Sequence, residues 1–587
     1  MPVSQQEQQV AEAEELLGDR LERASPAKGL FWGEHRLEEL PPYPLAPDAS
    51  IVRHLTELRS FCREHIDPVR IDREAEIPDS VVRGLGQLGV LGACLPESCG
   101  GLGMSQVNYC RLLETLGGHC ASTALFVNAH HSIGPRALVL FGTPEQQQKW
   151  LPRLATGEWI SAFALTEPEA GSDAANVQTT AIPTAEQRGF VLNGEKRWIT
   201  NGGIAQVLTV MARTPVEGNG SSKISAFIVT PDMPGFEILE KRMEKCGVRG
   251  TATSRLAFRD MFVPREHVLG QLGKGLRVAL TVLDFGRTTF GASCTGAAKF
   301  CVARAAGHAN RRVQFGRALG AFELVKHKLA AMQAGAYAME ACTYQTAALI
   351  DAGIEDFMLE TAMLKVFATD VLWQIVHDTI QIYGGKAYFT DEPFERLMRD
   401  ARINLIGEGA NDVLRVFSAL VGMRDVGLEL EAILNAIKMP VGRLGRLANF
   451  TQRKIGSWLV PPAIDLSSPE LERDGADFAQ LVAVFGRHVE RALRTYQREI
   501  FDRQYQLGRL ADAAIELYVS GCVLRRLDAT LKSRRAEHPQ EKFELASGRY
   551  YLHSAARRIR SHLAATTDNI DAETTDLADR LLAHFRV

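Results

Sequence analysis

The stretch GFVLNGEKRWITNG, residues 189–202, marks a change in the character of this 587-residue chain. Its apolar runs on either side of Asn193-Gly194 predict a β-hairpin. VLTVMART, ISAFIVT and SRLAFRDMFVP follow it and predict further strands. Residues 163–275 are therefore expected to form a mainly β domain in the interior of the chain.

The sequence on both sides of the β domain has helical periodicity. IVRHLTELRSFCREHI, which begins at Ile51, carries apolar residues at three- and four-residue spacing. GASCTGAAKFCVARAAGHANRR, which begins at Gly291, repeats small residues, as close helix packing requires. This order is not the βαβ alternation of a dinucleotide-binding fold. The chain also has no Walker A, His-Glu-x-x-His or Gly-x-Ser-x-Gly motif.

We expect a multidomain α+β protein with five parts in chain order. They are a weakly ordered N-terminal lead (1–50), an N-terminal helical domain (51–162), a central β-barrel-like domain (163–275), a C-terminal four-helix bundle that carries the catalytic site (276–430) and an extra C-terminal helical domain (431–587).

Composition narrows the class of protein. A net charge of −3 argues against a nucleic-acid-binding protein, which would need a basic surface. The ten cysteines form no Cys-x-x-Cys pair, which predicts buried reduced thiols and no metal site. The polar, acidic N-terminus lacks the apolar core of a signal peptide, and no apolar run reaches the roughly 18 residues of a spanning helix. These features predict a cytoplasmic protein.

Three polar segments could carry chemistry. FALTEPEAGSD, Phe163–Asp173, clusters small polar residues where a strand ends, so its backbone N–H groups and hydroxyls could meet a polar ligand. KRWITNGG offers the ring of Trp198 and the hydroxyl of Thr200 on a β scaffold. In NRRVQFGR, Arg312 and Gln314 could bind a pyrophosphate or an adenine edge. Each segment also has a plainer interpretation: the first as an ordinary turn, Trp198 as a core tryptophan and Arg312 as a surface arginine.

These motifs, in this order, resemble the acyl-CoA dehydrogenase family. The matching motifs lie between about residue 51 and residue 425: LTEPEAGSDA, KRWITNGG, TSRLAFRDMFVP, RRVQFG, QIYGG, ERLMRDARI and EGAND. GLFWGEHRLEELPPYP near the N-terminus, with NDVLRVFSALVGMRDVG and FDRQYQLGRLADAAIELY further on, resembles the very-long-chain branch. Members of that branch carry an extra helical domain and tend to form dimers.

The resemblance implies a bound FAD, because no side chain can accept a hydride. It places one set of residues along the flavin: Phe163, Leu165, Thr166, Ser172, Trp198 and Thr200. It places a second set on the FAD of a neighbouring subunit, which would make a homodimer necessary for activity: Arg312, Gln314, Phe322, Gln381 and Gly385. It also implies contacts with the acyl-CoA from four residues: Ser172, Asp284, Arg287 and Gly409.

Glu408, in INLIGEGAND, matches the proton-abstracting base of the family. Its flanking glycines would let the backbone approach flavin and thioester, and burial should raise the carboxyl pKa towards working pH. Some members carry the base on an earlier helix, at the position of Gly286, which cannot act as one. Gly407 and Ala410 depart from the family pattern, so we expect altered substrate fit or a weaker hold on FAD there.

Other charged residues near these motifs have structural interpretations. The charged residues of ERLMRDAR are expected to form an ion-paired turn: Glu395, Arg396, Arg399, Asp400 and Arg402. His130 and His131 are expected to be packed or solvated. The family's acyl pocket lies near residues 124–128, where this chain has Ala124 but also Val127 and Asn128, so a long acyl chain is inferred from the branch alone.

We therefore expect FAD-dependent α,β-dehydrogenation of a long-chain fatty acyl-CoA to the trans-2-enoyl-CoA. Glu408 would remove the proton, flavin N5 would accept the hydride, and the electrons would pass to an electron-transfer flavoprotein. Two alternatives stay open: an acyl-CoA oxidase that uses O2, and a non-enzymatic scaffold or assembly protein on the same fold. Residues 438–460 interleave basic and apolar side chains, which suggests peripheral membrane contact. A solvated helix fits that pattern equally well.

Overall fold

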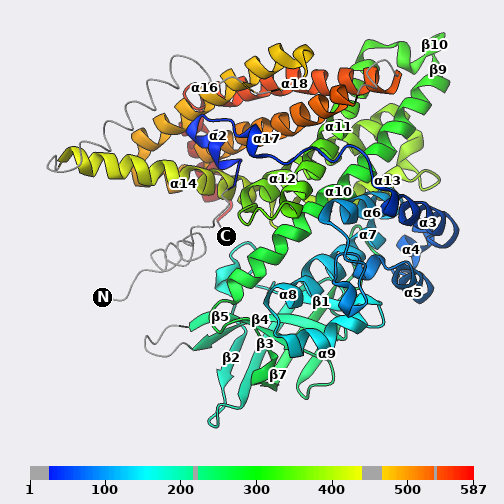
Figure 1. Cartoon of the computed structure of the whole chain (residues 1–587), viewed down its shortest axis with the longest axis vertical. Helices are drawn as coiled ribbons and strands as arrows, with labels where there is room; N and C mark the ends of the chain where they lie inside the picture. The colour runs from blue at the N-terminus through cyan, green and yellow to red at the C-terminus, as the bar shows by residue number, and fades with distance from the viewer. Residues whose placement is uncertain (1–24, 216–221, 439–463, 465, 534–538, 587) are drawn as a thin grey trace. The chain divides into compact units, whose positions relative to one another are not determined.

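The computed structural model describes residues 25–215, 222–438, 464, 466–533 and 539–586 (Figure 1). The chain divides into two compact units. Apart from the N-terminal residues that are not described, the first contains Ala46–Ala410, and the second contains Ala24–Leu45 together with Asn411–Val587. No helix in the described part of the chain is long and apolar enough to cross a membrane.

The first unit begins with a layer of helices, as predicted for residues 51–162. They are α3 (Ala49–His65), α4 (Pro68–Glu74), α5 (Asp79–Gln87), α6 (Gln106–Gly117), α7 (Ala121–Asn128), the π-helical turn η4 (Ala129–Ile133), α8 (Gly134–Phe141) and α9 (Pro144–Ala155). Local sequence sets several of the starts. Asp48 accepts from the backbone N–H of Ile51, and Thr143 with Gln146 forms a capping box at α9.

The central domain is one eight-stranded mixed sheet (Figure 1). Its strands are β1 (Ser161–Ala164), β2 (Thr180–Pro183), β3 (Gly189–Ile199), β4 (Val207–Pro215), β5 (Ser222–Val229), β6 (Phe236–Glu240), β7 (Ser254–Pro264) and β8 (Val268–Leu269). The order is β6-β7-β3-β2-β4-β5-β8, with β1 parallel to β4. One face packs on α8 and α9 through a buried cluster that includes Leu138, Trp150 and Met211.

The predicted hairpin at Asn193-Gly194 is wrong. Both residues lie inside β3, which continues to Ile199. The Asn193 amide does not cap a turn, because it bonds across to β7, donating to Asp260 Oδ1 at 3.0 Å and accepting from the Asp260 N–H at 2.9 Å. Gly194 is needed for close approach, since a Cβ there would lie 2.4 Å from Thr179 Oγ1. The β2–β3 turn lies earlier, over residues 184–188.

Three long helices of the first unit follow one another, with α11 antiparallel to the other two: α10 (Gly275–Arg311), α11 (Glu323–Asp351) and α12 (Met358–Tyr383). A short hairpin of β9 (Val313–Gln314) and β10 (Arg317–Ala318) joins α10 to α11. Small residues bring helices together as predicted, since a Cβ at Gly296 of α10 would lie 1.9 Å from the Glu114 carbonyl of α6. The turn η8 (Gly384–Tyr388) and helix α13 (Phe394–Arg402) follow.

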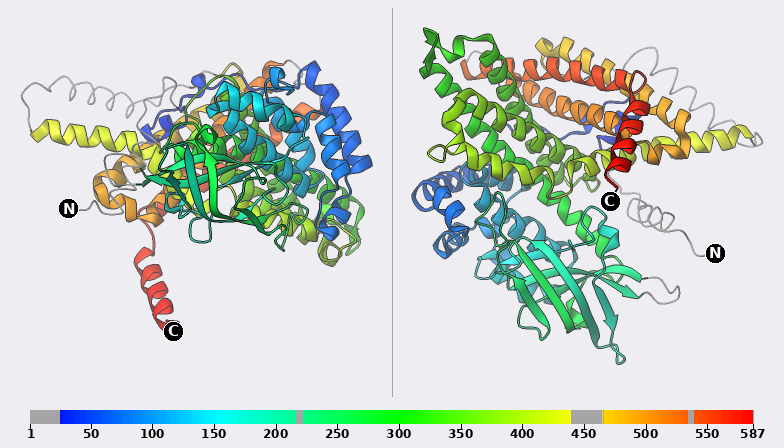
Figure 2. Two further views of the ribbon diagram at one scale, coloured as in Figure 1. Left: turned by 90° about the horizontal axis from the view of Figure 1, so that it is seen from below. Right: turned by 180° about the vertical axis from the view of Figure 1, so that it is seen from behind.

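The second unit is helical, as predicted for the C-terminal part. It contains α2 (Lys28–Trp32), α14 (Asn411–Lys438), α16 (Glu472–Tyr496), α17 (Gln504–Lys532), α18 (Pro539–Ala565) and α19 (Asp571–His584). Helices α16, α17 and α18 lie side by side, and α19 leads away from them in Figure 2. Helix α14, expected to be the last helix of the catalytic bundle, is grouped with this unit.

Residues 25–45 are not a weakly ordered lead. Phe31 is fully buried and meets Phe485 of α16 edge to face, with ring centroids 5.1 Å apart. Its ring also lies directly over Gly422 of α14, where a Cβ would approach to 2.2 Å. The sequence did not show this order because Phe31 packs on residues that lie several hundred positions away in the chain. The rest of the predicted lead, residues 1–24, lies outside the described residues.

Candidate active site

Glu408 lies in a tight turn that follows α13 and the short helix η9 (Ile403–Leu405). The turn starts with a 2.8 Å bond from the Gly407 N–H to the Ile403 carbonyl. Glu408 has φ +60° and Gly409 has φ +99°. The left-handed region is natural for glycine but costs a glutamate about 1–2 kcal/mol. Non-glycine residues held there are often found at functional sites.

The Glu408 carboxyl group is buried, although the residue as a whole is partly exposed. Among the described residues its Oε2 has no hydrogen-bond partner. It faces the glycine gap on α10, since a Cβ built on Gly286 would lie 3.5 Å from Oε2 and 3.1 Å from Ile133 Cγ2. Burial raises the pKa of Glu408, against the opposing charges of Arg287 and Lys365. This direction is the one expected for a general base.

Two cations hold the backbone of the turn. Arg287 Nε of α10 donates to the Glu408 carbonyl at 3.2 Å, and Lys365 Nζ of α12 donates to the Gly409 carbonyl at 2.6 Å. Arg287 also pairs with Asp284 at 2.9 Å, and Asp284 accepts from Thr361 Oγ1 at 3.0 Å. Burial raises the pKa of Asp284 to about 6. Asp284 and Arg287, predicted to contact substrate, thus form the buried wall behind Glu408.

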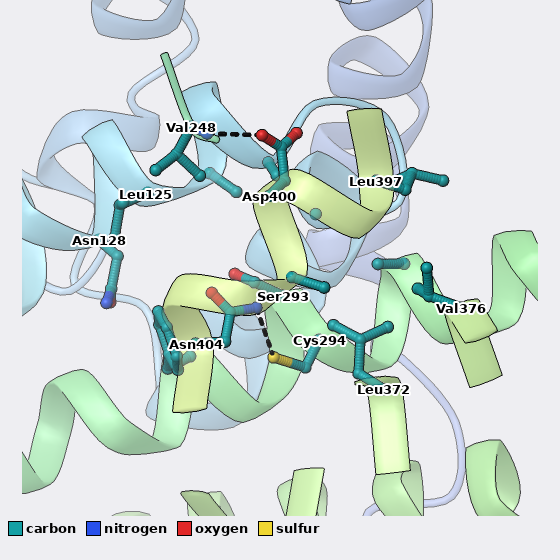
Figure 3. Close-up of a pocket in the computed structure, with 16 residues that line it drawn as sticks. Leu125, Asn128, Val248, Ser293, Cys294, Leu372, Val376, Leu397, Asp400 and Asn404 are labelled. Atoms are coloured by element: carbon teal, nitrogen blue, oxygen red, sulfur yellow. Dashed lines mark hydrogen bonds between the residues drawn. The ribbon is translucent and has the colours of Figure 1, made fainter. Parts of the chain in front are cut away.

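A cavity lies beside this wall, between α6, α7, α10, α12 and α13 (Figure 3). Its α10 side is a single helical stripe: Phe290, Ser293, Cys294 and Ala297. The opposite side includes Ala124, Leu125 and Asn128, close to where the sequence placed the acyl pocket.

Asn128, which lines the cavity, bonds to α10 at and next to Gly286, the residue that the Glu408 carboxyl group faces. Its Nδ2 lies 3.5 Å from the Gly286 carbonyl, and its Oδ1 accepts from Thr289. Further along, Asp400 accepts from the Val248 N–H, and Asn404 Nδ2 points at Cys294 Sγ (Figure 3). The cavity therefore starts about one helical turn from Gly286 and extends along α10.

The β domain carries a second group of predicted site residues, the β-domain wall. The segment after β1 is held by β3, since the Arg197 N–H donates to the Thr166 carbonyl at 3.0 Å and Lys196 Nζ donates to the Leu165 carbonyl at 2.9 Å. This brings Leu165 and Thr166 to the end of β3, next to Trp198. Trp198 is not the core tryptophan of the plainer interpretation, because it is 50% exposed and has φ +60°.

The remaining predicted residues of this wall differ in exposure. Phe163 is buried in the sheet core. Ser172 is exposed in the following loop, and Thr200 is half-buried. Asn201, just beyond β3, donates to the Phe126 carbonyl at 3.1 Å and so joins the β domain to α7.

The second predicted cofactor set gathers at the far end of the long helices. Arg312, Gln314 and Phe322 lie around the α10–α11 connection, and Gln381 and Gly385 lie at the end of α12. His308 stacks on Tyr383 at 4.0 Å, which fixes these two helix ends side by side. Arg312 is about 37 Å along α10 from Arg287, at about 1.5 Å per residue. Within one chain this set is therefore separate from Glu408.

The expected structural roles of neighbouring charged residues are largely confirmed. Arg399 pairs with Glu395 and with Asp72 of α4, at 2.9 and 2.7 Å. His130 and His131 are fully buried in η4. Asp400 departs from the predicted ion-paired turn, because it bonds to the Val248 N–H instead.

Lys365 is a residue that sequence reasoning missed. It is fully buried and contacts the turn that holds Glu408. The signal was a single lysine inside the apolar run ETAMLKVFATD, residues 360–370. The described residues contain no cluster of side chains that could hold a metal ion.

Comparison with protein families accounts for most of the chain. Family models match it in order: acyl-CoA dehydrogenase N-terminal domain over 53–158, middle domain over 162–261, C-terminal domain over 273–420 and ACAD9/ACADV C-terminal domain over 469–583. The mitochondrial very long-chain specific acyl-CoA dehydrogenase of Rattus norvegicus is 36% identical over 566 residues, which are 94% of this chain and 85% of that protein. The chain belongs to the acyl-CoA dehydrogenase family.

Two further proteins are similar to this acyl-CoA dehydrogenase over nearly its whole length. The probable acyl-CoA dehydrogenase FadE10 of Mycobacterium bovis is 34% identical over 602 residues, covering 98% of this chain and 91% of its own. A crystal structure of an acyl-CoA dehydrogenase from Bacillus anthracis, complexed with FAD, superposes with a TM-score of 0.79 at 28% identity and covers 95% of this chain and 94% of that one. The helical–β–helical order and the extra C-terminal helical part are thus confirmed as family features.

Proposed function

We propose that this protein is an FAD-dependent dehydrogenase of long-chain fatty acyl-CoA, with Glu408 as the base that removes the Cα proton. The observation that carries the proposal is the state of the Glu408 carboxyl. It is buried, its Oε2 has no partner among the described residues, and it faces the open side of Gly286. A buried carboxylate without a partner is costly, which is understandable if a substrate proton is its partner.

The β-domain wall fits a planar cofactor. Trp198 is half exposed beside Leu165 and Thr166, so a flat ring could stack against exposed aromatic and backbone surface there. We propose that Phe163, through its backbone, Leu165, Thr166, Ser172, Trp198 and Thr200 line the FAD. When bound, FAD supplies the hydride acceptor that the side chains lack.

The chain's own residues divide the remaining work. Glu408 takes the Cα proton when its carboxyl group is ionised, and its raised pKa makes it a stronger base than an ordinary glutamate. The cavity along α10 takes the acyl chain, and the largely apolar walls of this cavity exclude water. Ser172 and the backbone of Gly409 are proposed to contact the acyl-CoA, with Asp284 and Arg287 supporting them from behind.

We propose a homodimer on the basis of the second set of residues. The set at the far end of the helix bundle is about 37 Å along α10 from the Glu408 wall at about 1.5 Å per residue, yet it includes exposed Arg312 and open space at Gly385. We propose that it completes the FAD site of a second copy. An electron-transfer flavoprotein is the proposed electron acceptor.

One experiment tests the proposal. Purified wild-type protein is mixed anaerobically with acyl-CoAs of graded chain length, and flavin bleaching is followed. We expect bleaching by long chains, none in Glu408→Gln with FAD content unchanged, and wild-type bleaching in the control Glu395→Gln, which removes the ion-paired carboxylate nearby. Failure of every chain length to bleach the wild type would refute the dehydrogenase, and stoichiometric peroxide in air would identify an oxidase.

Membrane contact through residues 438–460, in a cytoplasmic protein, stays a prediction. Except for Lys438, these residues lie outside the described part of the chain. Flotation with anionic vesicles checks it: the full chain should float and a variant lacking 438–460 should not, whereas equal flotation would count against it.

A further inference from the structure

The turn that carries Glu408 needs external ties. Glu408 and Gly409 both have positive φ, at +60° and +99°. A glutamate does not hold this conformation without surrounding contacts that impose it. The side chain itself supplies none of these ties, since its Oε2 makes no hydrogen bond within the described residues. The ties must therefore act on the backbone of the turn.

Those ties come from two neighbouring helices. Arg287 of α10 holds the Glu408 carbonyl, and Lys365 of α12 holds the next carbonyl, that of Gly409. The two carbonyls are consecutive and their donors belong to different helices, so together they restrain the rotation of the turn. The Lys365 bond is the shorter, at 2.6 Å against 3.2 Å.

The charges of Arg287 and Lys365 both favour the ionised Glu408 carboxyl group, that of Arg287 the more strongly. Arg287 is compensated by its bond to Asp284. Lys365 is fully buried, and burial lowers its pKa to about 8. Glu408 is the group that opposes this lowering most strongly, ahead of Cys294 and Asp370. Placing an ammonium group here is costly, which points to a role that an apolar residue could not fill.

We infer that Lys365 is a positioning residue for the proton-transfer step: its ammonium group fixes the Gly409 carbonyl, so that the Glu408 carboxyl faces Gly286, and its charge joins that of Arg287 in favouring the ionised carboxyl. This inference rests on the proposed function, in which Glu408 is the base. The charged groups around Glu408 are Arg287, with Asp284, from α10 and Lys365 from α12. Removing Lys365 would leave Arg287, which also pairs with Asp284, as the one cation that favours the ionised carboxyl among these groups.

The test uses four FAD-loaded full-length proteins: wild type, Lys365→Met, Lys365→Gln and Lys299→Met. Lys365→Gln keeps a donor for the Gly409 carbonyl but removes the charge. Lys299→Met is a matched control, because it removes an ion-paired lysine from α10 that bonds Glu114 and Glu340 instead. The first readout is the titration of the Glu408 carboxyl by infrared difference spectroscopy, with the band identified by its loss in Glu408→Gln.

We expect the carboxyl titration to move to higher pH in both Lys365 variants and to stay in place in Lys299→Met. Loss of positioning should lower kcat about 10- to 100-fold in Lys365→Met with KM within about 3-fold, and less in Lys365→Gln. A carboxyl titration that coincides with wild type in Lys365→Gln or Lys365→Met overturns the inference. If no acyl-CoA bleaches the wild type, the proposed function fails, whereas the titration still shows whether Lys365 controls Glu408.

Discussion

Replacing Glu408 should reveal a conflict between stability and function at this position. Its backbone is left-handed, with φ +60°, and its carboxyl group is buried without a hydrogen-bond partner among the described residues. Both features cost free energy of folding. Glu408→Gly removes both, whereas Glu408→Ala removes the carboxyl group but keeps a Cβ in the left-handed region. Comparing the two variants isolates the backbone strain.

The size of this difference follows from general values. A residue with a Cβ costs about 1–2 kcal/mol in the left-handed region, and glycine loses about 0.5–1 kcal/mol through its freer unfolded chain. The glycine variant should therefore be about 1 kcal/mol more stable than the alanine variant, which corresponds to about 2 °C in melting temperature. Neither variant should be dehydrogenation-competent.

Thermal melts of the FAD-saturated variants, with tryptophan fluorescence as the signal, measure the difference. Gly407→Ala serves as the control, because Gly407 needs no left-handed conformation and the nearest atom to an added Cβ is the Ile403 carbonyl at 3.6 Å. Equal melting temperatures for Glu408→Gly and Glu408→Ala would refute the claim that the turn is strained.

Three further predictions concern charge, burial and chain length. Because burial raises the pKa of Glu408, kcat should fall as pH drops through that raised pKa. The free energy of unfolding of the wild type should fall as pH rises from the pKa of Glu408 in the unfolded chain to its raised pKa in the folded protein. In urea titrations Glu408→Gln should therefore be more stable than wild type above that pH window and should lose this advantage below it. Lys196→Met should destabilise the protein by about 3–5 kcal/mol, because it leaves the buried Glu167 carboxylate without the lysine with which it forms a 2.7 Å ion pair. Adding Glu167→Gln should restore much of the lost urea midpoint. Ala297→Leu, at the cavity end about 16 Å along α10 from Gly286, should lower kcat/KM at least about 10-fold for the longest acyl-CoAs and hardly change it for the shortest; an equal loss at all lengths would contradict the assignment of the cavity.

The sequence predicted the site where local motifs are specific. EGAND predicted Glu408 as the base and Gly286 excluded the alternative position, and in the structure the Glu408 carboxyl group faces that glycine. KRWITNGG predicted Trp198 on a β scaffold, and the structure has it near the end of β3 with half of its surface exposed. Chemistry that depends on a short motif is visible in the chain itself, because the motif fixes both residue type and local backbone.

The predictions from sequence were wrong or incomplete where a residue contacts a partner that is distant in the chain. Asn193-Gly194 has the composition of a hairpin turn, but Asp260, 67 residues later, bonds the Asn193 side chain within the sheet. Phe31 looked like part of a loose lead, but Phe485 covers it. Lys365 was passed over because nothing near it in the chain shows that Gly409 lies within reach of its ammonium group. Local propensity cannot encode these long-range contacts.

The measurement that tests the central claim most directly is proton exchange at Cα, separated from oxidation. An acyl-CoA analogue with sulfur in place of Cβ has no Cβ hydride to lose, so in D2O it reports only removal and return of the Cα proton. Wild type and Glu395→Gln should exchange this proton at similar rates, whereas Glu408→Gln should be slower by about 100-fold or more. Exchange at the wild-type rate in Glu408→Gln, with the analogue bound equally well, would show that another group is the base.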